Sequence, residues 1–392
     1  MQATVELMPI NPLQTHARLF SMLVLSWALA SCGTSTPRVV CPASSSSSTT
    51  CTCGSGTAAC PISPGPAFLY ASGGGTIAGF SIDHSTGALS QVATATGPSI
   101  SYGLAAVNNQ FLFASDRSQG QMDGFSINQT TGVLTTLQGS PFPAGTLSAP
   151  TGLASPSGSS FLYAADIAAV DSFTVNSAGM PSAIMGSPFP SGSSLFLAAD
   201  PSGEFLYAPD ANPPGSVIAF TISSTGALTA VPDSPFAIPG QTDSLPTGIV
   251  DTGSYVYVTL SLTSQIAAFS IVTGTGALTP VPNSPFPTGA NPAAIVFANG
   301  FLYVLNDGSI SGYSINSSSG VLTPLSGSPF AIVGLAIAAD SLDQYLYVSG
   351  LTGIQAFSID PISGSLTPVA GSPFPASLTL PQVLTVVQIP PP

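Results

Sequence analysis

The chain is 392 residues long, but only 5% of its residues are charged, and 16 acidic residues against three basic ones give a formal net charge of −13. Binding to the phosphates of nucleic acid depends on clustered Lys and Arg. This composition therefore excludes nucleic acid as a partner and excludes attachment to anionic lipid by charge. Hydrophobic residues make up 44% of the chain, which is enough for a large buried core.

The first 31 residues are predicted to be a lipoprotein signal peptide. Arg18 precedes an apolar segment, residues 19–30, that is too short to span a bilayer as a mature helix. The segment runs into the sequence Leu-Ala-Ser-Cys32, which resembles the bacterial lipobox, whose cysteine is acylated and becomes the first residue. We therefore expect lipidation at Cys32, export to the bacterial cell envelope (periplasm or outer membrane), and membrane contact through this lipid only. Conventional cleavage nearby is the alternative.

Residues 32–66 are rich in Ser, Thr, Pro and Gly and are predicted to form a tether. Besides Cys32, the tether contains all the other cysteines of the chain, namely Cys41, Cys51, Cys53 and Cys60. In an exported protein an even set suggests two disulfides, with three connectivities open. A four-thiolate zinc site is the competing interpretation, although the spacing lacks two Cys-x-x-Cys pairs.

From residue 67 onward, one sequence motif recurs seven times. It consists of an aromatic-aliphatic-aromatic triplet, an aromatic-Ser/Thr-aliphatic strand, a small-residue turn and, in most units, Ser-Pro-Phe. The triplets are 43 to 50 residues apart and begin at Phe68, Phe111, Phe161, Phe205, Tyr255, Phe301 and Tyr345. A period of this length, built of short strands and turns, is typical of a propeller blade. For residues 67–392 we predict an all-β fold, a seven-bladed β-propeller of four-stranded antiparallel blades.

The fifth unit shows the expected order of strands within a blade. Residues 255–258 and 266–271 are aromatic and β-branched, and Gly276 lies in the turn that follows, where a left-handed conformation is required. Residues 278–286 should form one outer strand, because their prolines cannot donate to a ladder and fit only an edge. The aromatic residues that end these outer strands should wedge between neighbouring blades: Phe142, Phe189, Phe236, Phe286, Phe330 and Phe374.

The innermost strand of each blade should precede the triplet, because short runs of small apolar residues stand there in units two to seven. The first unit has no such run. Residues 381–389 have the missing pattern with no triplet after them. We therefore predict that this C-terminal segment pairs into the first blade and closes the ring.

The repeat resembles a known family. Phe-Leu-Tyr-Ala-Pro-Asp210, Phe-Leu-Tyr-Val-Leu-Asn306 and Ser-Thr-Gly-Ala-Leu228 are similar to blade motifs of the lactonase-like propellers, which include the propeller-type 6-phosphogluconolactonases and YVTN-repeat proteins. The resemblance covers about residues 68–389. It implies a seven-bladed fold and a lactonase that presents His, Arg and acidic groups to a phosphosugar lactone. The propeller units contain one His, His84, and one Arg, Arg117, so no catalytic residue of the family can be assigned.

Topology places a set of polar residues on one face of the ring. The loops between second and third strands should share this face with the links between blades, which together carry Asp116, Arg117, Asp166, Asp210, Asn212, Asp243, Asn291, Asn306 and Asp307. These oxygens could hold Ca²⁺ or a cationic ligand, and no other cofactor is expected. Alternatively, Asp and Asn stand there because they favour turns. Arg117 could bind a carboxylate or form a surface ion pair with Asp116. His84 should be an exposed turn residue on the opposite face.

Two functions follow from the sequence. The first is a lipid-anchored, noncatalytic propeller that displays a binding face to an envelope protein or glycan. It is favoured because the propeller units have few catalytic groups, and no Gly-x-Ser-x-Gly motif joins a strand to a helix. The second is a lactone hydrolase that could use a metal-assisted mechanism. It is favoured by the family resemblance and the acidic loops.

Overall fold

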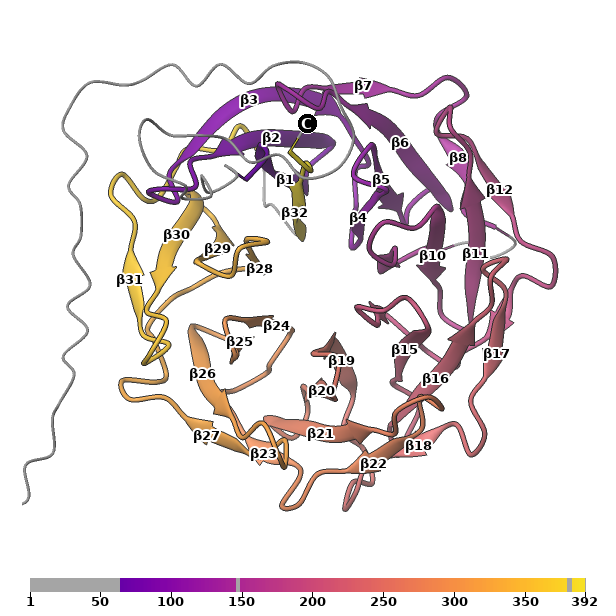
Figure 1. The fold of residues 1–392 in the computed structure, drawn as a ribbon, viewed down its shortest axis with the longest axis vertical. Coiled ribbons are helices and arrows are strands. Elements are labelled where there is room, and N and C mark those ends of the chain that lie inside the picture. Colours follow the sequence, from indigo (N-terminus) through magenta and orange to yellow (C-terminus); the bar gives the residue numbers. More distant parts are fainter. Residues whose placement is uncertain (1–63, 146–148, 379–382, 392) are drawn as a thin grey trace, which may run out of the picture. The chain divides into compact units, whose positions relative to one another are not determined.

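The computed structural model describes residues 64–145, 149–378 and 383–391, which form seven antiparallel sheets arranged in a ring (Figure 1). These residues contain 32 strands and no helix, so none of them lies in a helix that could span a membrane. The fold is the seven-bladed β-propeller that the sequence predicts. The predicted signal peptide, Cys32 and the four tether cysteines lie outside the described residues.

Each blade has an inner strand at the centre of the ring and a triplet strand beside it. The inner strands of blades 1 to 7 are β32 (Val383–Gln388), β4 (Leu104–Val107), β9 (Leu153–Ala154), β14 (Ala198–Ala199), β19 (Pro246–Asp251), β24 (Ala294–Ala298) and β28 (Ala336–Ala339). The triplet strands are β1 (Ala67–Gly73), β5 (Phe111–Asp116), β10 (Phe161–Ala165), β15 (Phe205–Asp210), β20 (Tyr255–Leu260), β25 (Phe301–Asn306) and β29 (Tyr345–Gly350).

The third strands continue each sheet outward. They are β2 (Thr76–Ile82), β6 (Gln121–Ile127), β11 (Ala169–Val175), β16 (Ser216–Ile222), β21 (Gln265–Ile271), β26 (Ser309–Ile315) and β30 (Gly353–Ile359). The outer strands of blades 1, 6 and 7 are β3 (Leu89–Thr96), β27 (Leu322–Pro324) and β31 (Leu366–Pro368). In blades 2 to 5 the outer edge has two pieces, β7 (Leu134–Thr136) with β8 (Phe142–Pro143), β12 (Pro181–Ala183) with β13 (Phe189–Pro190), β17 (Leu228–Ala230) with β18 (Phe236–Ala237), and β22 (Leu278–Pro280) with β23 (Phe286–Pro287).

The divided outer edge corrects the prediction of one continuous strand over residues 278–286. In blade 5, β22 and β23 pair with opposite ends of β21, and a turn separates them. The serine of Ser-Pro-Phe explains how the gap is tolerated, because Ser284 Oγ accepts a hydrogen bond from the Ala268 N–H at 2.9 Å. The equivalent serines of blades 2, 3, 4, 6 and 7 do the same, so the motif supplies a side-chain acceptor in the interrupted ladder.

The C-terminal strand closes the ring as predicted. β32 pairs antiparallel with β1 in a register that places Tyr70 opposite Thr385. Figure 1 shows β32, in yellow, on the inner side of the indigo β1. Just beyond these strands, the Ile389 N–H donates to the Pro66 carbonyl at 2.8 Å. The first blade is therefore built from both ends of the described chain.

Aromatic side chains join the blades. The phenylalanines of Ser-Pro-Phe pack in apolar clusters that each combine residues of two neighbouring blades, as predicted. Phe142 and Phe286 are fully buried there, and the other four are half-buried. In every blade but the second, the last residue of the triplet is a completely buried tyrosine whose hydroxyl donates to the carbonyl of a turn glycine in the next blade, as Tyr207 does to Gly276 at 3.2 Å. The core therefore extends from blade to blade.

Candidate binding pocket

The loops between second and third strands lie beside the links between blades. In blade 4 the Ala211 N–H donates to the Ser193 carbonyl at 2.9 Å, and in blade 6 the Asp307 N–H donates to the Ala290 carbonyl at 2.9 Å. We call this side of the ring the mouth face and the opposite side, which carries the hairpin turns after the third strands, the hairpin face. The nine candidate residues belong to the loops and strand ends of the mouth face.

Three of the nine residues hold the links between blades in place. Asp166 Oδ2 accepts from the Ala149 N–H at 3.1 Å, and Asp210 Oδ1 accepts from the Ser193 N–H at 2.9 Å. Asn306 Oδ1 accepts from the Thr288 hydroxyl at 3.1 Å. Asp166 and Asn306 are almost completely buried. These oxygens satisfy backbone and hydroxyl donors of the links that lead into their own blades.

Asp116 and Arg117 do not bind each other in the way the sequence suggested. Asp116 Oδ1 accepts hydrogen bonds from the backbone and hydroxyl of Ser118, which closes the loop after β5. The Arg117 guanidinium instead lies over the Tyr102 ring, 5.4 Å from its centroid. The one arginine of the propeller units is thus stacked against an aromatic side chain at the mouth of the central opening.

The other four candidates are exposed: Asn212, Asp243, Asn291 and Asp307. Among the residues that the structure describes, no group of three or more His, Cys, Asp or Glu side chains is placed to hold a metal ion. The nine residues are therefore distributed around the mouth face, and only Asn291 lines the central pocket.

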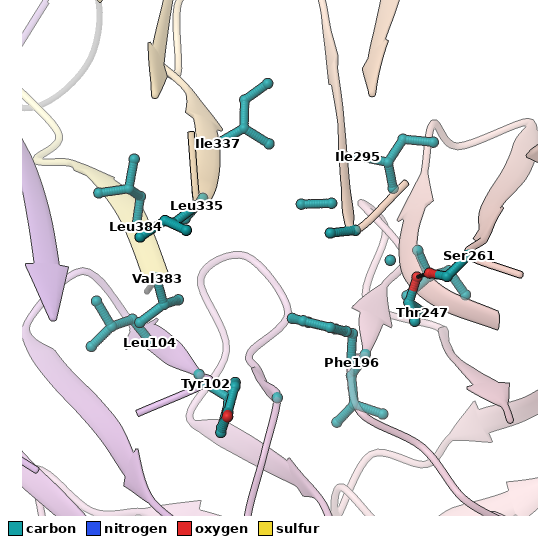
Figure 2. A pocket seen from close by; sticks show the side chains of 18 of the residues that line it. Tyr102, Leu104, Phe196, Thr247, Ser261, Ile295, Leu335, Ile337, Val383 and Leu384 are labelled. Carbon is teal, nitrogen blue, oxygen red and sulfur yellow. Dashed lines mark hydrogen bonds between the residues drawn. The ribbon is translucent and has the colours of Figure 1, made fainter. Parts of the chain in front are cut away.

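That pocket lies at the mouth-face end of the ring's central opening and has a volume of about 560 Å³ (Figure 2). Its wall is made where the inner strands begin, so every blade contributes to it. Most of the lining is aliphatic or aromatic, including Leu104, Phe196, Ile295, Ile337 and Leu384. Small-molecule sites typically have a volume of roughly 300–1,000 Å³, an apolar wall and a few polar groups.

Blade 5 contributes a polar corner to this wall. Thr247 Oγ1 lies 2.9 Å from the hydroxyls of both Thr259 and Ser261, and Ser261 donates to the Pro292 carbonyl at 2.7 Å. Figure 2 shows the Thr247 and Ser261 oxygens together on one side of the pocket. A hydroxyl that donates once keeps lone pairs that can accept a further hydrogen bond, so this corner can bind a ligand donor.

The backbone around this corner departs from the other blades. β19 is the one inner strand whose pairing with its triplet strand shifts register, between Pro246 and Ile249. Leu245, directly before it, has a φ of 47°, and Asn291 has a φ of 49°. Positive φ is rare for a bulky residue such as Leu245 and costs roughly 1–3 kcal/mol, whereas Asn adopts it readily. Bulges and strained residues gather at functional sites, and here they adjoin the pocket.

His84 differs from its expected environment. It lies in the turn between β2 and β3, on the hairpin face as predicted, but it is half-buried rather than exposed. Its Nε2 is 2.9 Å from the Gly65 carbonyl oxygen. The side chain therefore anchors the point at which the chain enters the propeller.

Two carboxyl groups with raised pKa values, Asp251 and Asp123, lie outside the pocket lining. Burial raises the pKa of Asp251 to about 7, with a smaller contribution from the charge of Asp200, although the Gly253 N–H opposes the shift. Burial also raises the pKa of Asp123 to about 6, and the charge of Asp116 acts in the same direction. Sequence reasoning did not single out Asp251 or Asp123, because their environment depends on how neighbouring strands pack.

The chain matches no family model and no curated protein sequence, but solved structures share its fold. A candidate 6-phosphogluconolactonase of Bacteroides fragilis is 16% identical, with a TM-score of 0.69 over 84% of this chain and 99% of that one. A candidate 6-phosphogluconolactonase of Bacteroides uniformis is 16% identical, with a TM-score of 0.70 over 83% of this chain and 100% of that one. The periplasmic gluconolactonase of Pseudomonas aeruginosa is 18% identical, with a TM-score of 0.67 over 83% and 100%. The fold is therefore that of the lactonase-like seven-bladed propellers.

Proposed function

We propose that this protein is a noncatalytic binding module of the bacterial cell envelope, held there by a lipid on Cys32, and that its central pocket takes the ligand. One observation carries the proposal. The pocket wall is apolar, and its polar side chains are the hydroxyls of Tyr102, Thr247 and Ser261 and the amide of Asn291. Such groups bind by burial and hydrogen bonding.

The chemistry of hydrolysis favours this proposal over an enzyme. Opening a lactone takes a general base or an activated water within hydrogen-bond reach of the reacting carbonyl. The carboxylates of Asp166 and Asp210 on the mouth face accept hydrogen bonds from backbone N–H groups, and neither residue lines the pocket. Asp116 is similarly bound to Ser118. A phosphosugar would also need positive charge, and the propeller units offer only Arg117, which stacks on Tyr102.

A second candidate is a lactonase that acts on an uncharged lactone with the help of a metal ion. It is favoured by the structural likeness to a protein described as a gluconolactonase and by the acidic residues of the mouth face. In this alternative Asp116, Asp166, Asp210 and Asp307 would have to move together to bind the ion.

The two proposals separate in one set of assays on the full chain purified from membranes. We expect the uncharged fluorophore N-phenyl-1-naphthylamine to bind with saturation, and we expect Phe196→Ser to weaken that binding. We also expect no hydrolysis above the spontaneous rate for neutral sugar lactones or 6-phosphogluconolactone, with Ca²⁺ or with a chelator. Calcium-dependent turnover that is lost in the exposed-site variant Asp307→Asn would establish the lactonase instead.

A further inference from the structure

Loops of blades 5 and 7 carry exposed aliphatic side chains on the mouth face, where Ile100 and Ile167 of blades 2 and 3 are exposed as well. In blade 5, Leu245 and Leu262 are 36% and 60% exposed, and in blade 7, Val333, Leu335 and Leu351 are 64%, 44% and 76% exposed. We call these five residues the apolar rim. Leu245 and Leu335 also line the pocket, so the apolar surface continues from the rim into the cavity.

Within each of the two blades, backbone hydrogen bonds join the loops that carry the rim residues. The Leu262 N–H donates to the Ser244 carbonyl at 3.3 Å, which brings Leu262 beside the link that carries Leu245. In blade 7 the Leu335 N–H donates to the Ser349 carbonyl at 2.8 Å, beside the loop that carries Leu351. The exposed side chains of each blade therefore stand on two loops that are hydrogen-bonded to each other.

Negative charge lies beside this apolar surface and between its two halves. Asp243 lies two residues before Leu245, and Asp307 follows β25 in blade 6, between the two halves of the rim; both are exposed. The one arginine of the propeller, Arg117, belongs to blade 2 and is stacked on Tyr102. A partner that complements this surface would therefore carry apolar side chains with positive charges on either side of them.

Both described ends of the chain lie on the hairpin face. The chain enters the propeller at Pro64–Pro66, where the Gly65 carbonyl bonds to His84 on the hairpin face. The C-terminal strand β32 ends beside the same segment, since Gln388 Nε2 donates to the Gly65 carbonyl at 2.7 Å. Both described ends of the chain therefore leave from the face opposite the pocket mouth.

We propose that the apolar rim docks a protein segment whose apolar side chain enters the pocket and whose flanking Lys or Arg residues face Asp243 and Asp307. This inference rests on the proposed binding function and names its ligand class. The strained Leu245 and the hydroxyls of Thr247 and Ser261 mark the place where the inserted residue meets the wall, and these hydroxyls can hydrogen-bond the backbone of the segment.

Three synthetic peptides of equal length test the proposal by fluorescence anisotropy with the full-length protein. The first has a Leu-Phe-Leu centre and Lys ends, the second has the same centre and Glu ends, and the third has a Ser centre and Lys ends. We expect the first to bind at least about tenfold more tightly than either of the others, because both burial and charge favour it. Added salt should reduce its advantage over the Glu-ended peptide.

Matched variants locate the site. Leu262→Ser combined with Leu351→Ser should weaken binding of the first peptide about tenfold or more. Met185→Ser combined with Ile362→Ser should leave it unchanged, because these residues are 93% and 90% exposed but lie outside the mouth face. Asp243→Asn with Asp307→Asn should abolish the preference for Lys ends over Glu ends.

The outcomes separate this inference from the proposed function. If N-phenyl-1-naphthylamine binds the pocket but no peptide does, or if all three peptides bind equally, the docking proposal is wrong and the binding module stands. Binding of an envelope oligosaccharide in place of the peptides would also overturn it. If neither fluorophore nor peptide binds, both proposals fall.

Discussion

The Tyr347 hydroxyl donates a hydrogen bond to the Gly87 carbonyl at 3.2 Å, which links the last blade to the first. The same bond runs from Tyr70, Tyr163, Tyr207, Tyr257 and Tyr303 to the turn glycine of the blade that follows each one. Both groups are buried, so each bond satisfies a donor and an acceptor that water cannot reach. This tyrosine of the triplet therefore ties neighbouring blades together around the ring.

Blade 2 lacks this bond, because Phe113 stands where the other blades have tyrosine. We expect Phe113→Tyr to raise the free energy of unfolding by about 1 kcal/mol, since the new hydroxyl would face the carbonyl of Gly179, the equivalent turn glycine. Tyr163→Phe, which deletes the bond in blade 3, should lower it by a similar amount. Urea unfolding of both variants measures the effect, and a less stable Phe113→Tyr would show that the turn of blade 3 has no room for the hydroxyl.

The turn glycines are needed for contact as well as for conformation. Gly276 has a φ of 70°, and a Cβ placed on it would lie 2.3 Å from the Phe205 ring. Gly274, two residues earlier, has a φ of 78° and nothing within 4 Å. We expect Gly276→Ala to destabilise the protein by about 1–3 kcal/mol more than Gly274→Ala, because only the first substitution forces a ring to move. Equal losses of Tm would mean that the backbone conformation alone sets the cost.

Much of this architecture can be predicted from the sequence because the same motif occurs seven times. The triplets, Gly276 and its equivalents, and the closing strand at residues 383–388 each have a local signal of periodicity or turn chemistry. The pocket has no such signal. Its wall combines the beginnings of seven inner strands, and its polar corner depends on the register shift of β19 beside Thr247.

The Asp and Asn residues of the mouth face show most clearly what cannot be predicted from the sequence. The sequence places Asp166, Asp210 and Asn306 at equivalent positions, but it cannot say whether their oxygens converge on a ligand or bind the adjacent backbone. In blades 4 and 6 the link contains a glycine, which lets the backbone of the link pack against this side chain. A Cβ on Gly192 would lie 2.4 Å from the Asp210 carboxyl carbon, so the link packs directly on the side chain.

Removal of the closing strand should open the ring. Deletion of residues 381–392 leaves β1 without its inner partner, and an exposed strand edge is a template for pairing with another molecule. We expect aggregation or loss of cooperative unfolding, measured by light scattering and thermal melting. Deletion of residues 390–392 alone spares β32 and should behave as the intact protein does. A monomeric 381–392 deletion with an unchanged Tm would contradict closure by this strand.

Lipidation at Cys32 is tested by mass spectrometry of the membrane fraction. We expect an N-terminal peptide that begins with an acylated Cys32 and lacks residues 1–31, because the apolar segment ends in Leu-Ala-Ser-Cys. Cys32→Ala should release the protein from the membrane, whereas Cys41→Ala should not. An unmodified N-terminus at another residue would establish conventional cleavage instead.

Asp251 should make the propeller less stable as the pH rises. Its pKa is about 7 in the folded protein against an ordinary value of 3.8, so the folded state binds this proton more tightly than the unfolded state does. The stabilisation from this group is complete below about pH 4 and is lost as the pH rises through about 7. The raised pKa of Asp123 acts in the same direction.

We expect Asp251→Asn, which still presents an oxygen to the Gly253 N–H, to raise the Tm at pH 8 and to flatten the dependence of Tm on pH between pH 4 and 8. Asp233→Asn, at an exposed position, provides the matched control. Unchanged pH dependence in Asp251→Asn would mean that Asp251 is already ionised in the folded protein at pH 5, and that its burial is offset by contacts to the charged form.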